Sequence, residues 1–467
     1  MNQPFPVTQR LPPGFAVALD ATVWRLDGGA ALLGGAPLRL LRLRPAAREL
    51  LAEQPLRVRD DRTAGLARRL LDAGVAHPRP EAVPSTHDVT VVIPVRDNAT
   101  GVQRLLRALD PTTQVIVVDD GSADPQQLQR IVGGAGLIRH PYSRGPAAAR
   151  NTGLAQVRTP FVAFLDSDVV PGPGWLQPLL AHLSDPAVAL VAPRITALEG
   201  AGGWVARYET VRSSLDLGRR EAPVLPRTRV AYVPSAALVL RVSAVQQDCF
   251  DEAMPVAEDV DLCWRLHAQG WRLRYEPTAT VAHQHRTHAR NWLARKVFYG
   301  TGAALLAARH LGQVAPVVLA PWTAAVWGLV LSGTRGGLVG AAAVTGASVL
   351  RLSGTLDGIE HPVSTAAVLA ARGVLGAGSQ LASAACRSYW PLTMVLGVGW
   401  PRARRALVAA AVLEGLADWA RHRAPGGLDP VRYLAAKRLD DAAYGAGLWW
   451  GAARARSWAA LRPAMVR

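Results

Sequence analysis

The chain has 467 residues, a net charge of +17 and a pI near 10.9. This length exceeds what one hydrophobic core normally covers, so several domains are expected. Its three cysteines are scattered and odd in number, which argues against a disulfide framework or a cysteine metal cage and favours a reducing compartment. The basic residues are almost all arginine and form no dense run interleaved with aromatics, so no nucleic-acid partner is expected.

The first 84 residues are predicted to form a separate module that ends in a proline-rich polar linker. Residues 11–35 predict a hairpin of short strands, broken at Asp27, Gly28 and Gly29. Two amphipathic helical patterns follow, RPAARELLAE and AGLARRLLDAGV, and VAHP is expected to close the module as a strand.

Three apolar segments that end in carboxylates come next. VTVVIPVRDN at 89–98 predicts a buried parallel strand, VIVVDDGS at 115–122 a second, and FVAFLDSD at 161–168 a third. Ligands of open α/β sheets bind outside the carboxyl ends of strands, so these carboxylates are expected to share one crevice. Four carboxylates in one crevice repel each other and need a metal or ligand donors. They are Asp119, Asp120, Asp166 and Asp168.

Two further segments carry charged groups, and the first of them suits an anionic ligand. RGPAAARNTG at 144–153 combines small residues, which allow close backbone approach, with an arginine fork that suits phosphate. The alternative for this segment is an ordinary helix start. AEDVDLCWRLHAQG at 257–270 predicts a helix with Glu258, Asp259 and Asp261 in its first turn, where acidic residues can also simply complement the helix dipole.

In this order the segments resemble a family 2 glycosyltransferase, with its VIP strand, DDGS turn, GxxxARNxG, DxD and an ED pair before a helix, over about residues 87–290. The resemblance implies an α/β fold of the GT-A type, a mixed sheet with helices on both faces, and inverting transfer from a nucleotide diphosphate sugar. By position it implies a base at Asp259 with Glu258 as fallback, a divalent metal (Mg²⁺ or Mn²⁺) at Asp168 with Asp166 and His283, and donor binding by Pro94, Asp119, Asp120, Arg150, Asn151 and Asp166. His285 and His288 are expected to be solvated loop histidines.

The sequence departs from the family pattern in two places. DCFDE at 248–252 replaces the more usual GGFDE, so acceptor contacts are not carried over from relatives. The QxxRW arrangement of processive synthases is missing, and RNWLARK at 290–296 is the nearest candidate. Repeated sugar addition therefore depends on resemblance alone.

The amino-terminal module resembles PqqD-like winged-helix domains, which grip a leader peptide by adding it as an edge strand. A plain helical prefix is the alternative. Together with the family 2 segments and a hydrophobic tail, the module makes the chain similar to transferases of a pathway that builds a peptide-derived redox cofactor. That similarity implies transfer of glucose from UDP-glucose to the cofactor precursor, with repetition as a β-linked oligoglucan.

The last third is hydrophobic. Residues 311–334 carry no charge and are long enough to span a bilayer, and residues 336–350 add a shorter run. Because Pro316 and Pro321 interrupt the first run, full spans, interfacial helices and a soluble helical cap all stay open. The arginines of RARR at 402–405 could meet anionic lipid.

These features predict three domains, residues 1–84, 85–300 and 301–467. Arg10, two prolines and Asp20 break the first apolar residues, so no signal peptide is expected, and the predicted location is the cytoplasmic face of the cell membrane. A membrane-associated transferase for envelope polysaccharide or glycolipid is the alternative function. A DNA-binding or leader-binding protein with an inert catalytic domain is a third, which the complete set of carboxylates argues against.

Overall fold

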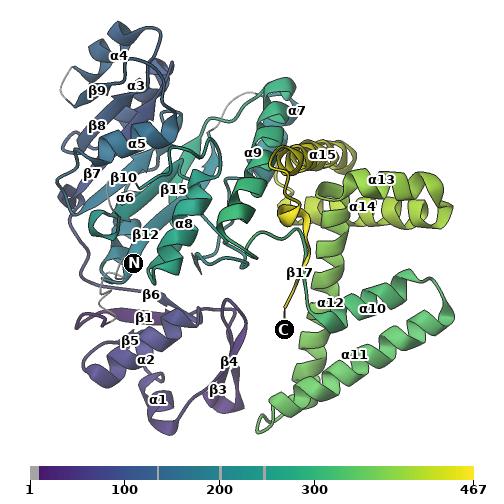
Figure 1. Ribbon diagram of the computed structural model, residues 1–467. Coiled ribbons are helices and arrows are strands. Elements are labelled where there is room, and N and C mark those ends of the chain that lie inside the picture. Colours follow the sequence, from purple (N-terminus) through teal and green to yellow (C-terminus); the bar gives the residue numbers. More distant parts are fainter. Residues whose placement is uncertain (1–9, 134–135, 199–201, 246–248, 467) are drawn as a thin grey trace. The chain divides into compact units, whose positions relative to one another are not determined.

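The structure is a computed structural model that describes residues 10–133, 136–198, 202–245 and 249–466. It divides into two compact units: residues 1–201 with 212–285, and residues 202–211 with 286–467 (Figure 1). Asp248, the first residue of the DCFDE departure, lies outside the described residues. Each unit has its own hydrophobic clusters.

The first unit begins with a small module of two three-stranded antiparallel sheets and two helices. One sheet places β1 (Ala16–Leu19) between β5 (Leu56–Arg57) and β6 (Ala76–Pro78). The other has the order β2 (Trp24–Leu26), β3 (Ala31–Gly34), β4 (Arg39–Arg42), and the helices are α1 (Pro45–Leu50) and α2 (Asp61–Asp72). The expected hairpin, both helices and the closing strand are confirmed. The winged-helix assignment stays a prediction.

A nine-stranded mixed sheet follows, as the resemblance predicted. Its order is β11-β15-β12-β14-β10-β7-β8-β9, with β13 paired to β15. β10, β7, β8 and β9 run parallel, whereas β14 is antiparallel to both β10 and β12. The strands are β7 (Val89–Val95), β8 (Gln114–Asp119), β9 (Leu137–Arg139), β10 (Phe161–Leu165), β11 (Val169–Pro171), β12 (Val188–Ala197), β13 (Ala222–Pro223), β14 (Ala237–Arg241) and β15 (Arg272–His283).

Helices cover both faces of this sheet. The central strand β7 has apolar side chains on both faces, so helices can pack against each of them. Val91 and Ile93 belong to the main core cluster with side chains of α3 (Ala99–Ala108) and α6 (Leu176–Leu183). The alternate residue Val92 points to the other face, where α5 (Pro146–Leu154) packs so closely that a Cβ on Gly153 would lie 2.3 Å from a Val92 methyl. α4 (Pro125–Val132) and α8 (Glu258–Ala268) complete the layers. The α/β fold class is therefore confirmed.

The second unit is helical. Its helices are α7 (Trp204–Arg212), α9 (Ala289–Arg309), α10 (Pro321–Leu331), α11 (Arg335–Thr355), α12 (Pro362–Arg387), α13 (Trp390–Gly399), α14 (Pro401–His422) and α15 (Pro430–Arg454). Glycines let α9 and α15 touch backbone to backbone, since a Cβ on Gly447 would lie 1.9 Å from the carbonyl oxygen of Val297. Beside this contact, Lys296 is buried between Glu209 and Asp440, at 3.0 and 3.3 Å.

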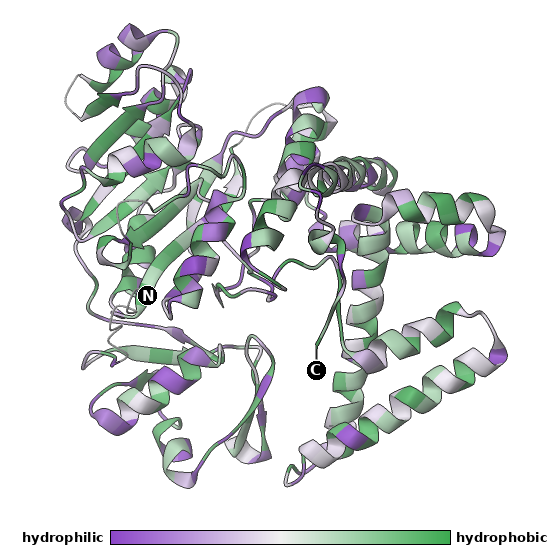
Figure 2. Ribbon diagram, in the orientation of Figure 1, coloured by the Kyte–Doolittle hydropathy of each residue, from purple (hydrophilic) through white to green (hydrophobic). Residues whose placement is uncertain are grey.

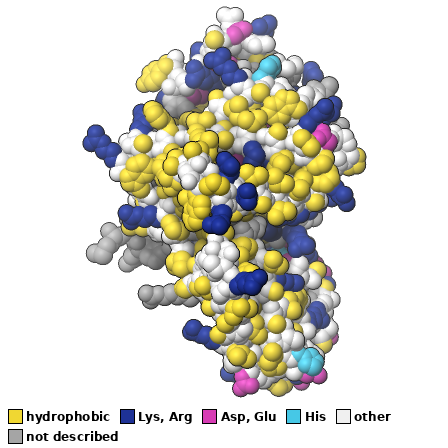
Figure 3. All heavy atoms as spheres, turned by 90° about the vertical axis from the view of Figure 1, so that its right-hand side faces the viewer, with side chains coloured by type: hydrophobic (Ala, Val, Ile, Leu, Met, Phe, Trp, Pro, Cys, Tyr) yellow, Lys and Arg dark blue, Asp and Glu magenta, His cyan; other side chains and the backbone are white. Residues whose placement is uncertain are grey.

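The uncharged run at 311–334 is not one continuous helix. A two-residue strand, β16 (Val318–Leu319), precedes Pro321, and α10 starts at that proline because its ring cannot continue a helix from the preceding residues. Among the described residues one helix, α11, is long and apolar enough to cross a membrane, and 11% of its apolar segment is buried. Apolar residues run along α10 to α14 (Figure 2), and the view in Figure 3 shows many hydrophobic side chains with basic side chains scattered among them.

Candidate active site

Strand pairing gathers the predicted site at one edge of the sheet. β10 ends at Leu165, directly before Asp166, and lies between β7 and the antiparallel β14. This pairing places Ala236 against the DxD turn, where its carbonyl oxygen accepts the Asp166 N–H at 3.0 Å. β11 then pairs with the end of β15, so that Val169 lies opposite His283. The strand pairs therefore bring three segments that are far apart in the sequence close together: residues 166–168, 235–236 and 283.

Asp168 and His283 come together through the β11–β15 pair. The Nε2 atom of His283 is 3.5 Å from the Oδ2 atom of Asp168, and the side chains are 17% and 39% exposed. The Nδ1 atom of His283 is buried with no hydrogen-bond partner among the described residues. A partly exposed carboxylate beside an imidazole suits a divalent ion such as Mn²⁺, so Asp168 and His283 fit the expected metal. Asp166 turns one carboxylate oxygen to Arg150 at 2.6 Å, and its share in a metal site stays a prediction.

Arg150, expected to bind the donor, lies buried between two carboxylates. Its Nη2 donates to Asp166 at 2.6 Å and its Nη1 to Glu258 at 3.2 Å, and the guanidinium lies 5.3 Å from the centre of the Phe250 ring. Arg150 comes from α5, Asp166 from the end of β10 and Glu258 from the start of α8. The guanidinium therefore links Asp166, a predicted metal ligand, to Glu258, one of the two candidate bases. Both of its terminal nitrogens are hydrogen-bonded to these acids, so fewer N–H groups remain for a phosphate.

Asn151 holds the chain that leads into α8. Its side chain donates to the Phe250 carbonyl at 2.7 Å and accepts the Phe250 N–H at 2.9 Å. A further contact to Glu252 measures 3.2 Å. Both ends of the amide are thus occupied by residues 250–252, and donor contact by Asn151 stays a prediction.

Asp119 and Asp120 are buried at the end of β8 and bonded to neighbouring segments. Asp119 accepts from the Ser122 N–H and from Arg139, each at 2.8 Å. Asp120 accepts from four groups, His140, the Ser143 hydroxyl and the N–H groups of Arg144 and Gly145, at 2.7–2.9 Å. Burial alone would raise the pKa of Asp120, but these hydrogen bonds lower it overall. Asp120 therefore stays ionised and fixes the loop before α5. Pro94 is buried in β7, on the face that α5 covers.

Asp259 has the surroundings of a general base. Its carboxylate accepts the N–H of Val260 at 2.8 Å and that of Ser235 at 3.1 Å, and it belongs to the first turn of α8. Burial, and after it the nearby Glu258, raises the pKa of Asp259 to about 7. Glu258 is ion-paired with Arg150, whereas Asp259 is held by neutral N–H groups. The two adjacent acids thus have different environments, and that of Asp259 suits proton transfer near neutral pH.

Ala257, the residue before this pair, has φ +65° and ψ +23°, a left-handed conformation. For a residue with a Cβ this costs roughly 1 kcal/mol or more and needs support from surrounding contacts. The turn sets the direction in which Glu258 and Asp259 leave the backbone. Neither this turn nor the Ser235 N–H, 24 residues upstream of Asp259, has a signal in the local sequence.

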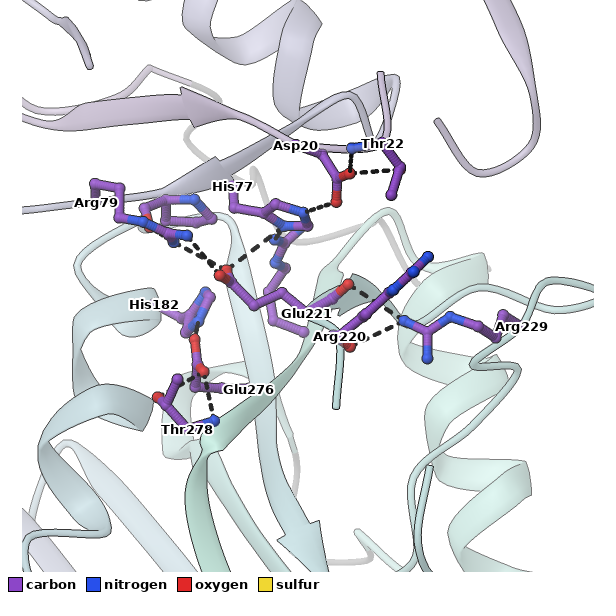
Figure 4. A network of polar contacts seen from close by, with 12 residues as sticks. Asp20, Thr22, His77, Arg79, His182, Arg220, Glu221, Arg229, Glu276 and Thr278 are labelled. Carbon is purple, nitrogen blue, oxygen red and sulfur yellow. Dashed lines mark hydrogen bonds and ion pairs between the residues drawn. The ribbon is translucent and has the colours of Figure 1, made fainter. Parts of the chain in front are cut away.

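Elsewhere in the first unit, polar side chains of the amino-terminal module meet the sheet (Figure 4). The guanidinium of Arg79 donates to both oxygens of Glu221, at 2.9 and 2.5 Å. His77 contacts Asp20 at 2.6 Å and Arg274 at 2.8 Å. We call the residues Asp20, His77, Arg79, His182, Glu221, Arg274 and Glu276 the junction network.

The junction network contains a possible set of metal ligands. Among the described residues, His182, Glu221 and Glu276 are the group of three whose donor atoms all lie within 4.8 Å of one another. However, both oxygens of Glu221 already bind Arg79, and the buried Arg274 adds a second cation, so a metal ion would meet two guanidiniums. The arrangement suits an ion-pair junction between the module and the sheet better than a metal site.

Comparisons with known proteins match the chain to glycosyltransferases. The profile "Glycosyl transferase family 2" matches residues 90–246. The chain is 53% identical over 463 residues to the pre-mycofactocin glycosyltransferase of two Mycobacterium tuberculosis strains, covering 97% of this chain and 98% of theirs.

Two solved structures show remote similarity only. A mannosyltransferase of Pyrobaculum calidifontis in complex with GDP-Man and Mn²⁺ has 18% identity and a TM-score of 0.37, with 65% of this chain and 90% of that one covered. Residues 1–349 of S. aureus TarS in complex with UDP-GlcNAc have 20% identity and a TM-score of 0.38, covering 48% and 66%. These two add nothing to the assignment, which the full-length identity carries: the chain belongs to family 2 of the glycosyltransferases.

Proposed function

We propose that the chain transfers a hexose, glucose from UDP-glucose, to the precursor of the peptide-derived redox cofactor mycofactocin, and that it repeats the transfer as a β-linked oligoglucan. The observation that carries the acceptor is the 53% identity to the pre-mycofactocin glycosyltransferase over nearly the whole chain. The PqqD-like module is proposed to hold the peptide part of the acceptor, and the chain is proposed to work at the cytoplasmic face of the cell membrane.

The proposed reaction is a single displacement with inversion. As the bond to the diphosphate breaks, positive charge develops on the sugar, and a base on the opposite face must take the proton of the attacking acceptor hydroxyl. Asp259 is proposed as this base because its pKa is raised to about 7 and, among the residues that the structure describes, its hydrogen bonds come from neutral N–H groups. No covalent glycosyl-enzyme intermediate is then needed.

The leaving group is anionic, and the site has groups that can compensate this negative charge. Asp168 and His283, with Asp166, would hold a divalent cation, which would neutralise the charge that develops on the diphosphate. Arg150 donates a hydrogen bond of 2.6 Å to Asp166 and so fixes the orientation of that carboxylate. Asp119 and Asp120, which anchor the β8 loop, are proposed to shape the nucleoside side of the pocket.

Asp168→Ala is expected to remove metal-dependent donor binding because it deletes the carboxylate that lies beside His283. Titration of UDP-glucose with and without Mn²⁺ measures this. Asp110→Ala is a matched control, since Asp110 is an exposed aspartate that binds the Thr112 N–H ahead of β8, at the opposite end of that strand from Asp119. Unchanged metal-dependent affinity in the Asp168 variant would remove this residue from the metal site.

Transfer is expected to depend on pH through Asp259. The base must be deprotonated, so kcat/KM should be at its plateau above pH 7 and fall as the pH drops through about 7. Glu258→Gln removes the like charge that helps to raise this pKa, so the acidic limb of the profile should move to lower pH. An acidic limb at the same pH in both proteins would contradict the coupling.

Mass spectrometry of the acceptor tests the proposed function. Purified protein, Mn²⁺, UDP-glucose and the mature cofactor precursor should give hexose additions, and Asp259→Asn should give almost none. Donor hydrolysis without addition to this precursor would overturn the proposed acceptor. Addition to a lipid acceptor instead would favour a transferase for envelope glycan or glycolipid, which the exposed apolar helices of the second unit make the second candidate.

A further inference from the structure

The second unit carries most of the net charge of the protein. Residues 286–467 contain 21 of the 52 basic residues but only 7 of the 35 acidic ones. Four of these acids, Glu414, Asp418, Asp440 and Asp441, are directed into the helix bundle, where their side chains are at most 9% exposed. The exposed surface of this unit is therefore basic.

The same unit exposes an apolar helix. α13 (WPLTMVLGVG) has no charged residue, yet its side chains face solvent on most sides: Leu392 55%, Met394 61%, Val395 74%, Leu396 48% and Val398 84% exposed. A helix that is apolar all round is normally buried. α14 continues the exposed apolar surface with Val408, Val412, Leu413 and Leu416 (Figure 2). Such a large patch indicates a surface that something covers.

Arginines border this apolar surface. Arg402, Arg404 and Arg405 lie in the first turns of α14, exposed, beside the 55% exposed Trp400. Cations at a helix amino terminus oppose the helix dipole, so they do not stabilise α14 itself. Tryptophan and arginine next to apolar side chains are the residues found where a protein meets the headgroup level of a bilayer. The surface of α13 and the start of α14 is called the α13–α14 face below.

We propose that the α13–α14 face binds the surface of an anionic lipid bilayer, with α13 lying flat in the interface. α13 has ten residues and is about 15 Å long, half of a hydrocarbon core of about 30 Å, so it is too short to cross. The arginines meet lipid phosphates while Val395 and Val398 enter the acyl boundary. A second copy of this chain is a poorer occupant because it would present the same positive charge. The inference names the surface behind the membrane contact proposed above and does not depend on the acceptor.

Vesicle flotation of the full chain tests this proposal. The protein should float with mixed phosphatidylcholine–phosphatidylglycerol vesicles, less with pure phosphatidylcholine, and less as salt is raised. The triple variant R402E/R404E/R405E should lose affinity for the anionic vesicles on the order of a hundredfold. R62E/R107E/R130E is the matched control, because it changes the net charge equally at exposed arginines of the first unit and should bind much like the wild type.

A second variant separates the apolar contribution. V395N/V398N places polar groups at exposed positions, so folding should be kept, as circular dichroism checks, while binding to anionic vesicles falls and becomes more sensitive to salt. Wild-type protein that stays with the dense fraction at low salt would overturn the proposal. So would equal losses in the two triple variants, or a wild-type dimer that V395N/V398N dissociates, since a second copy would then cover the face. Transfer activity is not measured, so failure here is distinct from failure of the proposed reaction.

Discussion

Asp259→Asn is expected to lower the rate of sugar transfer by about two to four orders of magnitude while UDP-glucose binding changes little. The amide keeps the size of the carboxylate, but its one oxygen can accept only one of the two N–H groups, because Ser235 binds Oδ2 of Asp259 at 3.1 Å and Val260 binds Oδ1 at 2.8 Å. It cannot take a proton from the acceptor hydroxyl. Single-turnover transfer measured by mass spectrometry, together with donor titration, separates chemistry from binding.

Glu258→Gln is the matched control for this experiment. Glu258 is adjacent to Asp259 but is paired with Arg150 at 3.2 Å, and the glutamine oxygen can still accept that hydrogen bond. The variant should therefore keep most of the transfer activity at pH values above 7. Wild-type transfer rates in Asp259→Asn, or a larger loss in Glu258→Gln, would assign the base to another residue.

Arg68→Ala is expected to destabilise the first unit by about 3–5 kcal/mol, the usual cost of leaving one member of a buried ion pair alone. Arg68 lies on α2 of the amino-terminal module and donates two hydrogen bonds of 2.7 Å to Asp185, which follows α6 of the catalytic sheet. The side chains are 9% and 2% exposed, so water cannot replace the lost partner. The midpoint of urea unfolding measures the change.

Arg59→Ala provides the matched control for Arg68→Ala. Arg59 belongs to the same module and pairs with Glu53 at 3.3 Å, but both side chains are more than two thirds exposed. An exposed pair contributes at most about 1 kcal/mol, so this variant should unfold close to the wild type. Equal shifts in the two variants would show that burial of the Arg68–Asp185 pair is not what stabilises the unit.

The same contacts bear on the role of the module. Removing residues 1–84 would uncover Asp185, Glu221 and Arg274, all of which bind module residues in the structure. Donor hydrolysis and acceptor binding should then fall together, because the catalytic sheet loses stability. Substitutions on the edge strands β2 and β4 leave the junction network intact. They are therefore the better test of whether the module itself binds the acceptor.

Local pattern was enough to predict the elements of the catalytic unit. The apolar runs that end at Asp119 and Asp166 are strands and the segment at Glu258 is a helix, as predicted, and the order of these motifs predicts family 2. At Arg150 the structure has the helix start that was the alternative for that segment. Such patterns are readable because alternate or continuous burial of a strand and the amphipathic face of a helix each leave a fixed spacing in the sequence.

The hydrophobic last third of the chain is less predictable, because composition alone does not show where a helix begins or what packs against it. Pro316 and Pro321 were correctly seen as interruptions, and the structure shows a two-residue strand before α10. The exposure of α13, with no charged residue in it, could not be read from its sequence, because the same ten residues could equally fill a bundle core.

The motifs in the sequence are sufficient to predict the family, the strands that end in carboxylates and the acids at positions 166, 168, 258 and 259. The surroundings of each acid come from the tertiary structure: the segment before the antiparallel β14 brings the Ser235 N–H to Asp259, and α5 brings Arg150 to Glu258. The physical reason is that burial and paired charges set the proton affinity of a carboxylate, and both come from segments distant in sequence.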